Sequence, residues 1–259
     1  MEEILQPQPD TGIGGKIIRY LGTWKLVKGV EFIQKGFFLQ FKSEDSEKRL
    51  HEKLRICPFS SSKEEEIAYI GKLAEKLREI IVEQIQTDQA KLFNPTFIIP
   101  KLHQKWRKIL GANSLNMEIQ MIHFKMNRTD QVRDLIRKGD WATNLDLKSA
   151  FHHLIIYPPH RSYLAFEAMG KVYQYRAMLF GTHHSQIFFV QTLAIVQKKK
   201  LRETDIGIFN FVDDLLLLHQ NKERIREESL TIMRILEAFG WTIAKEKCET
   251  EPKQQINFL

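Results

Sequence analysis

The sequence contains only two cysteines, Cys57 and Cys248, which lie far apart and form no Cys-x-x-Cys motif. Their scarcity argues against a disulfide scaffold and a cysteine-ligated zinc site, and it fits a reducing compartment. No apolar run approaches the roughly 18 residues of a membrane-spanning helix, and the acidic start Met1-Glu2-Glu3 is unlike a signal peptide. We therefore expect an intracellular protein without a membrane partner, in the nucleus or the cytoplasm.

The overall composition is that of an ordinary globular protein. Of 259 residues, 43% are hydrophobic and 27% are charged, which allows a substantial core and argues against wholesale disorder. The formal net charge is +7, and such a basic balance suggests a nucleic acid or an anionic surface as partner, although many basic proteins bind neither. The length allows one large domain or two small ones.

Two adjacent carboxylates, Asp213 and Asp214, stand between two short apolar runs. This pattern predicts two strands joined by a tight turn, with the acids at its tip. Like charges held so close repel unless a cation compensates them, and Mg²⁺ prefers carboxylate oxygens alongside substrate phosphates. The plainer alternative is a simple hairpin turn, because Asp is common in turns. The choice depends on a third carboxylate elsewhere in the chain.

Asp146 is the candidate for that third carboxylate, at the end of a strand predicted over residues 141–147. Taken alone, such an Asp is more often a helix cap or an ion-pair partner than a metal ligand. Combined with Asp213 and Asp214, it can hold two divalent ions about 4 Å apart, the geometry for in-line displacement at phosphorus. One ion would activate the attacking oxygen, and the other would neutralise the leaving pyrophosphate.

Helical and strand patterns alternate along the chain without an internal repeat, which predicts an α+β fold. Residues 1–15 are rich in Gln, Pro and Gly and predict a loose lead-in to a small folded appendage that ends at residue 62. Ser62 and Glu65 form a capping box, and the apolar residues at helical spacing behind it predict a helix whose apolar stripe belongs to the core.

Further elements follow from the apolar runs and their periods. Strands are predicted at 97–99, 106–110, 163–166 and 171–175, and helices at 129–137, 185–200 and 225–239. The last helix is expected to end in a left-handed cap at Gly240. The histidine pairs at 152–153 and 183–184 lack the spacing of a zinc site, and we interpret them as surface or groove-lining residues.

Five segments, in order along the chain, resemble the motifs of reverse transcriptases. Residues 145–151 resemble the first palm motif, and residues 211–214 match the aromatic-x-Asp-Asp hairpin. Between them, residues 173–181 resemble the segment that lines the nucleotide pocket. Upstream, residues 97–107 resemble the fingers hairpin, and downstream, residues 239–247 resemble the motif whose lysine lies near the pyrophosphate.

The resemblance covers roughly three quarters of the chain and implies a right-hand polymerase fold. We expect fingers and palm subdomains only, with an antiparallel palm sheet packed on helices and no thumb. The reverse transcriptase domain would span residues 63–259, with fingers at 63–121 and 154–184 and palm at 122–153 and 185–259. Residues 257–259 resemble the start of the primer grip, so the palm would be truncated there.

The resemblance also assigns the metal site. Asp146 and Asp213 would bridge two Mg²⁺ ions, for which Mn²⁺ is a possible substitute. Asp214 would complete the acidic cluster, and the backbone carbonyl of Leu147 would be a further oxygen ligand.

Six residues would bind the incoming nucleotide. Lys101 and Arg107 would clamp the triphosphate, as a point charge and a bidentate donor respectively. Phe151 would exclude a ribose 2′-OH and so select dNTPs. The nucleotide-binding residues are Lys101, Arg107, Phe151, Phe180, Gly181 and Lys247. Each assignment has a plainer alternative. Lys101 and Arg107 would lie on a solvated basic hairpin, the Phe151 ring would only pack in the core, and Lys247 would have no special role in its Lys-rich stretch.

Some positions depart from the family pattern. Leu179 stands where the family has Pro, Ser185-Gln186 stands for Ser-Pro, and Gly111 and Asn113 replace an Asp and an Arg before Leu115-Asn116. None of these changes removes a metal ligand or a phosphate clamp, but they alter the shape of the pocket.

The resemblance implies an RNA-directed DNA polymerase of a retroelement, which extends a primer 3′-OH with dNTPs on an RNA or DNA template. The alternatives are a catalytically inactive or repurposed nucleic-acid-binding relative and a viral RNA-dependent RNA polymerase, against which Phe151 argues. Some segments look most like the tyrosine-recombinase (DIRS-like) retrotransposons. These segments are residues 14–15, Trp24, 35–37, 138–141 and 150–153. Activity of this chain alone and its oligomeric state are left open.

Overall fold

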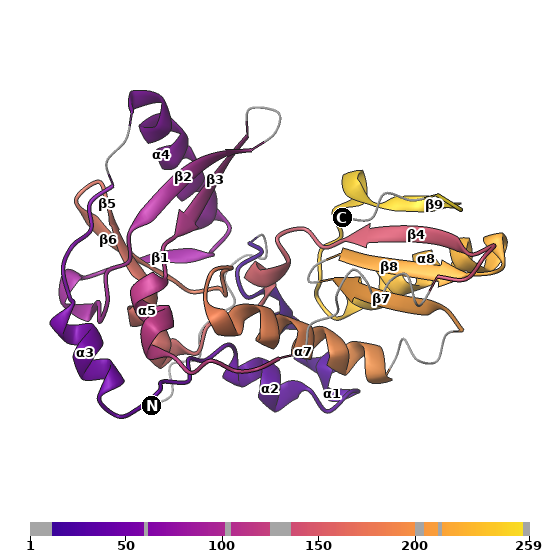
Figure 1. The fold of residues 1–259 in the computed structure, drawn as a ribbon, viewed down its shortest axis with the longest axis horizontal. Helices are drawn as coiled ribbons and strands as arrows, with labels where there is room; N and C mark the ends of the chain where they lie inside the picture. The colour runs from indigo at the N-terminus through magenta and orange to yellow at the C-terminus, as the bar shows by residue number, and fades with distance from the viewer. Residues whose placement is uncertain are drawn as a thin grey trace.

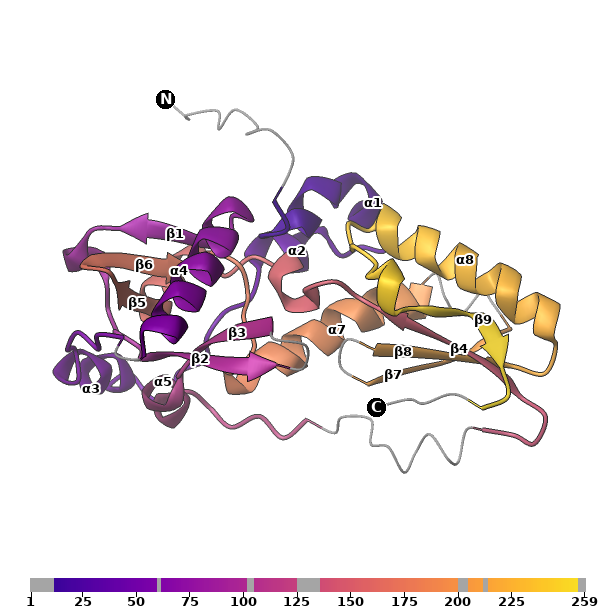
Figure 2. The same cartoon turned by 90° about the horizontal axis from the view of Figure 1, so that it is seen from above.

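The structure is a computed structural model that describes residues 12–59, 62–101, 105–124, 136–199, 205–211 and 214–255. These residues form two lobes arranged along the long axis of the molecule (Figure 1). The first lobe contains a three-stranded and a two-stranded sheet, and the second lobe contains a four-stranded sheet. Helices from the N-terminal part and the middle of the chain lie between the lobes (Figure 2).

All strand pairs of the first lobe are antiparallel. The larger sheet has the order β1-β6-β5, and the smaller is the hairpin β2–β3. The strands are β1 (Val82–Ile85), β2 (Thr96–Lys101), β3 (Lys105–Leu110), β5 (Ala165–Ala168) and β6 (Lys171–Tyr175). The accompanying helices are α3 (Ser46–Glu52), α4 (Lys63–Arg78) and α5 (Asn113–Glu118).

The second lobe is an antiparallel sheet with the order β7-β8-β4-β9. Its strands are β4 (Trp141–Asp146), β7 (Gly207–Phe211), β8 (Asp214–His219) and β9 (Glu249–Lys253). Helix α8 (Lys222–Ala238) lies along one face of this sheet (Figure 2). Leu215 and Leu217 join the main core together with α8, whereas Leu216 and Leu218 belong to a separate apolar cluster. Both faces of β8 are therefore apolar, which explains its uninterrupted run of leucines.

The N-terminal segment packs into the main core. It contains a 3-10 helix at Lys16–Tyr20 and the helices α1 (Leu21–Lys25) and α2 (Val30–Lys35). Helix α2 contacts α7 (His183–Lys199), because the Phe32 ring is stacked on the Phe188 ring. Trp24 is fully buried, its indole Nε1 donates to the Phe239 carbonyl at 3.0 Å, and its ring contacts the Phe239 ring edge-on. Ile17, Phe37 and Leu50 contribute to the same core. The domain boundary at residue 62 stays a prediction.

Several local predictions are confirmed. The capping box is complete, because the Ser62 side chain accepts from the Glu65 N–H and the Glu65 carboxylate accepts from the Ser62 N–H. Gly240 has a φ of +94° just beyond α8, as a left-handed cap requires. Mixed helices and antiparallel sheets agree with the α+β class. The helix predicted at 129–137 lies almost entirely outside the described residues.

The prediction that the whole apolar stripe of α4 belongs to the core is wrong. Tyr69 and Leu73 are buried, but the exposed fractions of Ile67 and Ile70 are 67% and 46%. Helix α4 contacts β1, β2 and β3 along the side that carries Tyr69, so the flanking apolar residues stay outside. Helical spacing alone does not reveal how wide the covered side is.

Two further predictions are corrected by the structure. Tyr163, expected in a strand, lies in a 3-10 helix (Pro158–Leu164) because two prolines at its start favour a helical turn over strand pairing. His153 and His184, expected at the surface or in a groove, are 0% and 4% exposed. Both imidazoles are hydrogen-bonded inside, His153 to the Thr242 hydroxyl and His184 to the Gln120 carbonyl.

Candidate active site

Asp146 and Asp214 lie next to each other at one end of the sheet of the second lobe. Asp146 is the last residue of β4 and Asp214 the first of β8, and the antiparallel register pairs the two directly. Phe211, the last residue of β7, pairs with Asp214 on the other side. Residues 212 and 213, and with them the predicted metal ligand Asp213, lie outside the described residues. The strands thus bring together the two described members of the predicted triad.

Lys247 neutralises Asp146. Its Nζ lies 2.9 Å from Asp146 Oδ2, and the exposed fractions of the two side chains are 61% and 17%. A 3-10 helix at Lys245–Lys247 directs Lys247 there, and its first turn is anchored because the Ala244 N–H donates to the Asp146 carbonyl at 2.9 Å. The resemblance placed this lysine near a pyrophosphate, and the structure places it on a carboxylate of the acidic pair.

The backbone after Asp146 runs beside the segment that carries Lys247. The Lys148 N–H donates to the Thr242 carbonyl at 2.8 Å, and Leu147 forms an isolated antiparallel bridge with Ile243. Because the hydrogen bonds of this bridge come from the residues on either side, the C=O of Leu147 points away from residue 243. This carbonyl thus faces the opposite side of the segment, and its role as an oxygen ligand stays a prediction.

The Cys248 side chain contacts the backbone of Asp146. The Asp146 N–H donates to the Cys248 Sγ at 3.3 Å, and the thiol lies 3.3 Å from the Ala244 carbonyl. Burial, together with the negative charge of Asp146, raises the pKa of the Cys248 thiol. The cysteine therefore remains a neutral support for the strand end.

The aromatic residues of the predicted pocket form a second group. Phe151 lies in a 3-10 turn (Ala150–His153) that follows Ser149, whose φ of +51° reverses the chain. The Phe151 ring is stacked on Phe189 at 4.9 Å and meets the edge of Phe180 at 5.6 Å. The exposed fraction is 8% for Phe151 and 59% for Phe180. The Phe151 ring therefore packs in the core with one side against the exposed Phe180, so gating and core packing are compatible.

Asn116 holds the segment after Phe180, and sequence reasoning missed it. Its amide Nδ2 donates to the Gly181 carbonyl at 2.9 Å, and its Oδ1 accepts from the His183 N–H at 3.1 Å. Gly181 has a φ of +119°, a conformation that other residues rarely adopt. The only signal in the sequence was the position of Asn116 in the Leu-Asn pair after the fingers hairpin.

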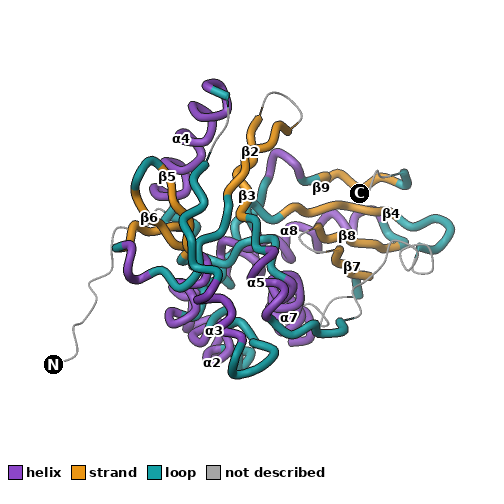
Figure 3. The backbone as a smooth tube through the Cα atoms, turned by 60° about the vertical axis from the view of Figure 1, so that its left-hand side comes forward, coloured by secondary structure: helices purple, strands orange, loops and turns teal. Residues whose placement is uncertain are grey.

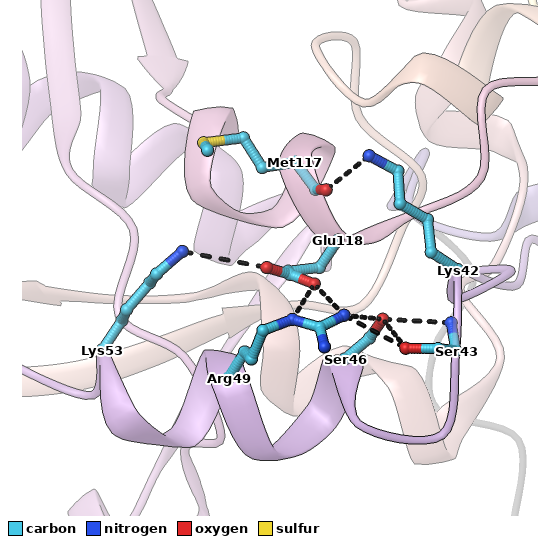
Figure 4. A network of polar contacts seen from close by, with 7 residues as sticks. All are labelled: Lys42, Ser43, Ser46, Arg49, Lys53, Met117 and Glu118. Carbon is cyan, nitrogen blue, oxygen red and sulfur yellow. Dashed lines mark hydrogen bonds and ion pairs between the residues drawn. The ribbon is translucent and has the colours of Figure 1, made fainter.

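A polar network fixes the helix that carries Asn116. Glu118, at the end of α5, accepts from Arg49 Nε at 2.9 Å and forms ion pairs with Arg49 and Lys53 of the α3 side (Figure 4). The hydrogen bond from Arg49 lowers the pKa of the Glu118 carboxyl. Lys42 adds a hydrogen bond from its Nζ to the Met117 carbonyl at 2.7 Å. Helix α5 is thus tied on one side to the N-terminal segment and on the other to Gly181.

The basic hairpin β2–β3 lies at the side of the first lobe nearer to the second lobe (Figures 1 and 3). Arg107 is exposed and pairs with Ile99, and Lys101 pairs with Lys105 next to the hairpin tip. The tip itself, residues 102–104, lies outside the described residues. The structure thus places Lys101 and Arg107 on one hairpin, and their contact with a triphosphate stays a prediction.

Two cavities among the described residues of the second lobe lie away from these residues. These cavities, of about 460 and 630 Å³, share Asp140 and Leu218 in their walls, at the end of the sheet opposite to Asp214. No predicted site residue lines them. Within the described part of the chain, no three His, Cys, Asp or Glu residues form a group that could hold a metal ion. None of the described helices is long and apolar enough to cross a bilayer.

Comparison with known proteins assigns the family. Residues 72–259 match the family model described as "Reverse transcriptase (RNA-dependent DNA polymerase)". The chain belongs to the reverse transcriptase family. The match includes both lobes and the Asp146–Asp214 pair, but it begins inside α4 and leaves the N-terminal segment uncovered.

Three relatives of this reverse transcriptase chain are viral proteins. It is 24% identical over 192 residues to the "Putative enzymatic polyprotein" of Cassava vein mosaic virus, and the matched region is 72% of this chain and 29% of the relative. It is 24% identical over 180 residues to the "Pro-Pol polyprotein" of Simian foamy virus type 1, and this matched region is 70% of this chain and 15% of the relative. For "Protein P" of a duck hepatitis B virus (strain China), the identity is 27% over 128 residues, 49% of this chain and 16% of the relative. The chain thus spans less than a third of these relatives.

Proposed function

We propose that this chain carries the nucleotidyl-transfer site of an RNA-directed DNA polymerase that extends a primer 3′-OH with dNTPs on an RNA or DNA template, as part of retroelement replication. The single observation that supports the site most directly is the register that pairs Asp146 with Asp214 at the end of the sheet. In this proposal the first lobe corresponds to the fingers and the second to the palm.

The residues present fit divalent metal ions. Asp146 and Asp214 offer carboxylate oxygens side by side, Asp213 adjoins them in sequence, and the Leu147 carbonyl points away from its neighbouring segment. Hard oxygen ligands of this kind suit Mg²⁺, with Mn²⁺ as a substitute. Lys247 already supplies a positive charge to Asp146, so this carboxylate has a cationic partner in the absence of metal. When bound, two metal ions would lower the barrier to in-line displacement at phosphorus.

The protein's own residues position the reactants. Lys101 and Arg107 would hold the triphosphate, Arg107 through paired N–H donors. Phe180 and Gly181 would line the base and sugar, and Phe151 would leave no room for a 2′-OH. Lys247, at 2.9 Å from Asp146, would transfer its contact to the pyrophosphate and donate a proton to it.

The test is primer extension with the purified chain, an RNA template annealed to a DNA primer, Mg²⁺ and dNTPs. We expect incorporation by the wild-type chain and its loss in Asp146→Asn, Asp213→Asn and Asp214→Asn, with template binding retained. Asp88→Asn is the matched control, because Asp88 is exposed in the first lobe, outside the predicted site. Undiminished extension by the Asp146→Asn variant would refute the proposed site.

A catalytically inactive, nucleic-acid-binding relative is the second candidate. Leu179 stands where the family has proline, and its side chain is 3% exposed. The buried segment directly before Phe180 is therefore packed with a different side chain than in the family. This candidate predicts salt-sensitive binding of template and primer with no incorporation of dNTPs by the wild-type chain. Placement among the tyrosine-recombinase (DIRS-like) retrotransposons also stays a proposal, supported only by the segments compared in the sequence.

A further inference from the structure

The 3-10 turn that carries Phe151 has a second side chain with a specific partner. Phe151 points toward Phe180 and Phe189, whereas the next residue, His152, contacts helix α4 and the segment before Phe180. The turn thus joins the cluster of Phe151, Phe180 and Phe189 on one side to the first lobe on the other. Nothing in the proposed chemistry uses His152.

His152 is a donor at one ring nitrogen and an acceptor at the other. Its Nδ1 lies 2.8 Å from the carbonyl of Met178, which can only accept, so Nδ1 carries the proton. Its Nε2 lies 3.3 Å from the Nζ of Lys76 and therefore accepts from the ammonium group. The side chain fixes its own tautomer through these two contacts, and it bridges Lys76 and Met178.

The burial of this pair agrees with that assignment. Burial and, to a smaller extent, the charge of Lys76 lower the pKa of His152 to about 3. Burial also lowers the pKa of Lys76 to about 8, against the opposing charge of Glu75. Near neutral pH, His152 is thus a neutral acceptor and Lys76 a charged donor. The Tyr175 ring, 5.2 Å from the Lys76 Nζ, provides a further favourable contact for the cation.

The contact with Met178 joins the two segments that would line the predicted nucleotide pocket. Met178 is fully buried, and its N–H donates to the Leu154 carbonyl at 2.8 Å. His152 supplies the partner of its C=O, so both backbone groups of Met178 are held by the turn that carries Phe151. Two residues further on is Phe180, whose ring meets Phe151 at 5.6 Å. The bond from His152 is therefore one of the contacts that hold the segment leading to Phe180 against the turn that carries Phe151.

We propose that Lys76 and His152 are positioning residues for sugar selection, which set the distance between Phe151 and the Phe180 segment and so exclude a ribose 2′-OH. This inference rests on the proposed polymerase function and on Phe151 as the gate. Neither residue touches the nucleotide; both act through the walls of the pocket. A displacement of the wall by a fraction of an ångström would admit a hydroxyl without removing any group that holds a dNTP.

The experiment measures kcat/KM for dGTP and for GTP opposite a template cytosine, with the full chain. The variants are His152→Phe, which removes both contacts, His152→Asn, whose amide keeps a donor for Met178, and Lys76→Met, which removes the cation. Lys72→Met is the control, because Lys72 lies on the same helix in an exposed pair with Glu75. A thermal melt of each variant verifies that it is folded at the assay temperature.

We expect His152→Phe to lower the ratio of dGTP to GTP efficiency by about tenfold, mainly because the KM for GTP falls. His152→Asn should retain the ratio of the wild type within about threefold. Lys76→Met should lower the ratio by about threefold. The control should match the wild type. If His152→Phe melts below the assay temperature, the comparison of Lys76→Met with Lys72→Met decides.

The outcomes separate the inference from the function on which it rests. An active wild type whose ratio is unchanged in His152→Phe and Lys76→Met overturns the inference alone. Equal losses of efficiency for dGTP and GTP also overturn it, because they indicate a merely structural role. A wild type that incorporates neither nucleotide overturns the proposed function and the inference with it.

Discussion

Lys247 Nζ lies 2.9 Å from Asp146 Oδ2 and forms an ion pair at the edge of the acidic pair. The lysine is mostly exposed and the aspartate is mostly covered, so the charge of Asp146 is compensated from the solvent side. A metal ion that binds Asp146 must compete with this ammonium group for the same carboxylate. The pair therefore connects the proposed metal site to the segment after Gly240.

Replacement of Lys247 by Gln should strengthen metal binding. Removal of the competing charge should raise the affinity for Mn²⁺ by about two- to fivefold, since an exposed ion pair contributes at most ~1 kcal/mol. Titration of the metal-free chain with Mn²⁺, followed by electron paramagnetic resonance, measures this affinity directly. The control is Lys245→Gln, two residues earlier on the same 3-10 helix. Weaker Mn²⁺ binding by Lys247→Gln would contradict the competition, and it would imply that Lys247 organises the carboxylates for the metal.

The buried histidine His153 should make folding sensitive to acid. Burial lowers the pKa of His153 to about 4, below the ordinary value of about 6.5 for an unfolded chain. The unfolded state therefore binds more protons between these values, so the stabilising contribution is complete above pH 6.5 and is lost as the pH falls toward 4. The loss is on the order of 3 kcal/mol for this one group. Urea unfolding at several pH values between 7.5 and 4.5 measures the slope.

The matched variant for this prediction is His153→Gln, whose amide can replace the contact with Thr242. We expect a smaller loss of unfolding free energy between pH 7.5 and 4.5 than in the wild type. His51→Gln serves as the control, because His51 is exposed in α3. An acid slope that is the same in His153→Gln and in the wild type would exclude His153 as its source.

The N-terminal segment should be required for stability, although the family match begins at residue 72. Trp24→Phe removes the hydrogen bond to the Phe239 carbonyl and leaves a cavity, and Trp24→Ala removes the whole fully buried ring. The expected losses are about 1–3 kcal/mol for Trp24→Phe and about 3–5 kcal/mol for Trp24→Ala. Urea unfolding measures both. Losses below about 0.5 kcal/mol, typical of surface positions, would show that the segment does not stabilise the fold.

The sequence predicted the proximity of Asp146 and Asp214 because chemistry and local pattern coincide there. Asp146 and Asp214 each end or begin a strand of apolar residues, and antiparallel pairing brings such ends together. The same holds for the capping box at Ser62, which depends on residues three positions apart. The β2–β3 hairpin is likewise local, since its strands pair across a short tip.

The missed features depend on contacts between distant residues. The apolar stripe of α4 has the right period, but only the three-dimensional packing decides that Ile67 is exposed and Tyr69 buried. His152 and His153 look alike in the sequence, yet one meets Lys76 and the other Thr242. Asn116 holds Gly181 from a position 65 residues away. Such partners leave no periodic signal, so a single sequence does not reveal them.

Asn116 should affect nucleotide binding more than stability. In Asn116→Asp the carboxylate cannot donate to the Gly181 carbonyl and places a negative charge beside it, while an acceptor for the His183 N–H remains. The Phe180–Gly181 segment should therefore shift, and we expect the KM for dNTPs to rise by about tenfold with a smaller change in kcat. Steady-state primer extension measures both constants. Asn113→Asp, at the exposed start of the same helix, should behave like the wild type. A lower kcat with an unchanged KM in Asn116→Asp would instead place the role of Asn116 in the chemical step.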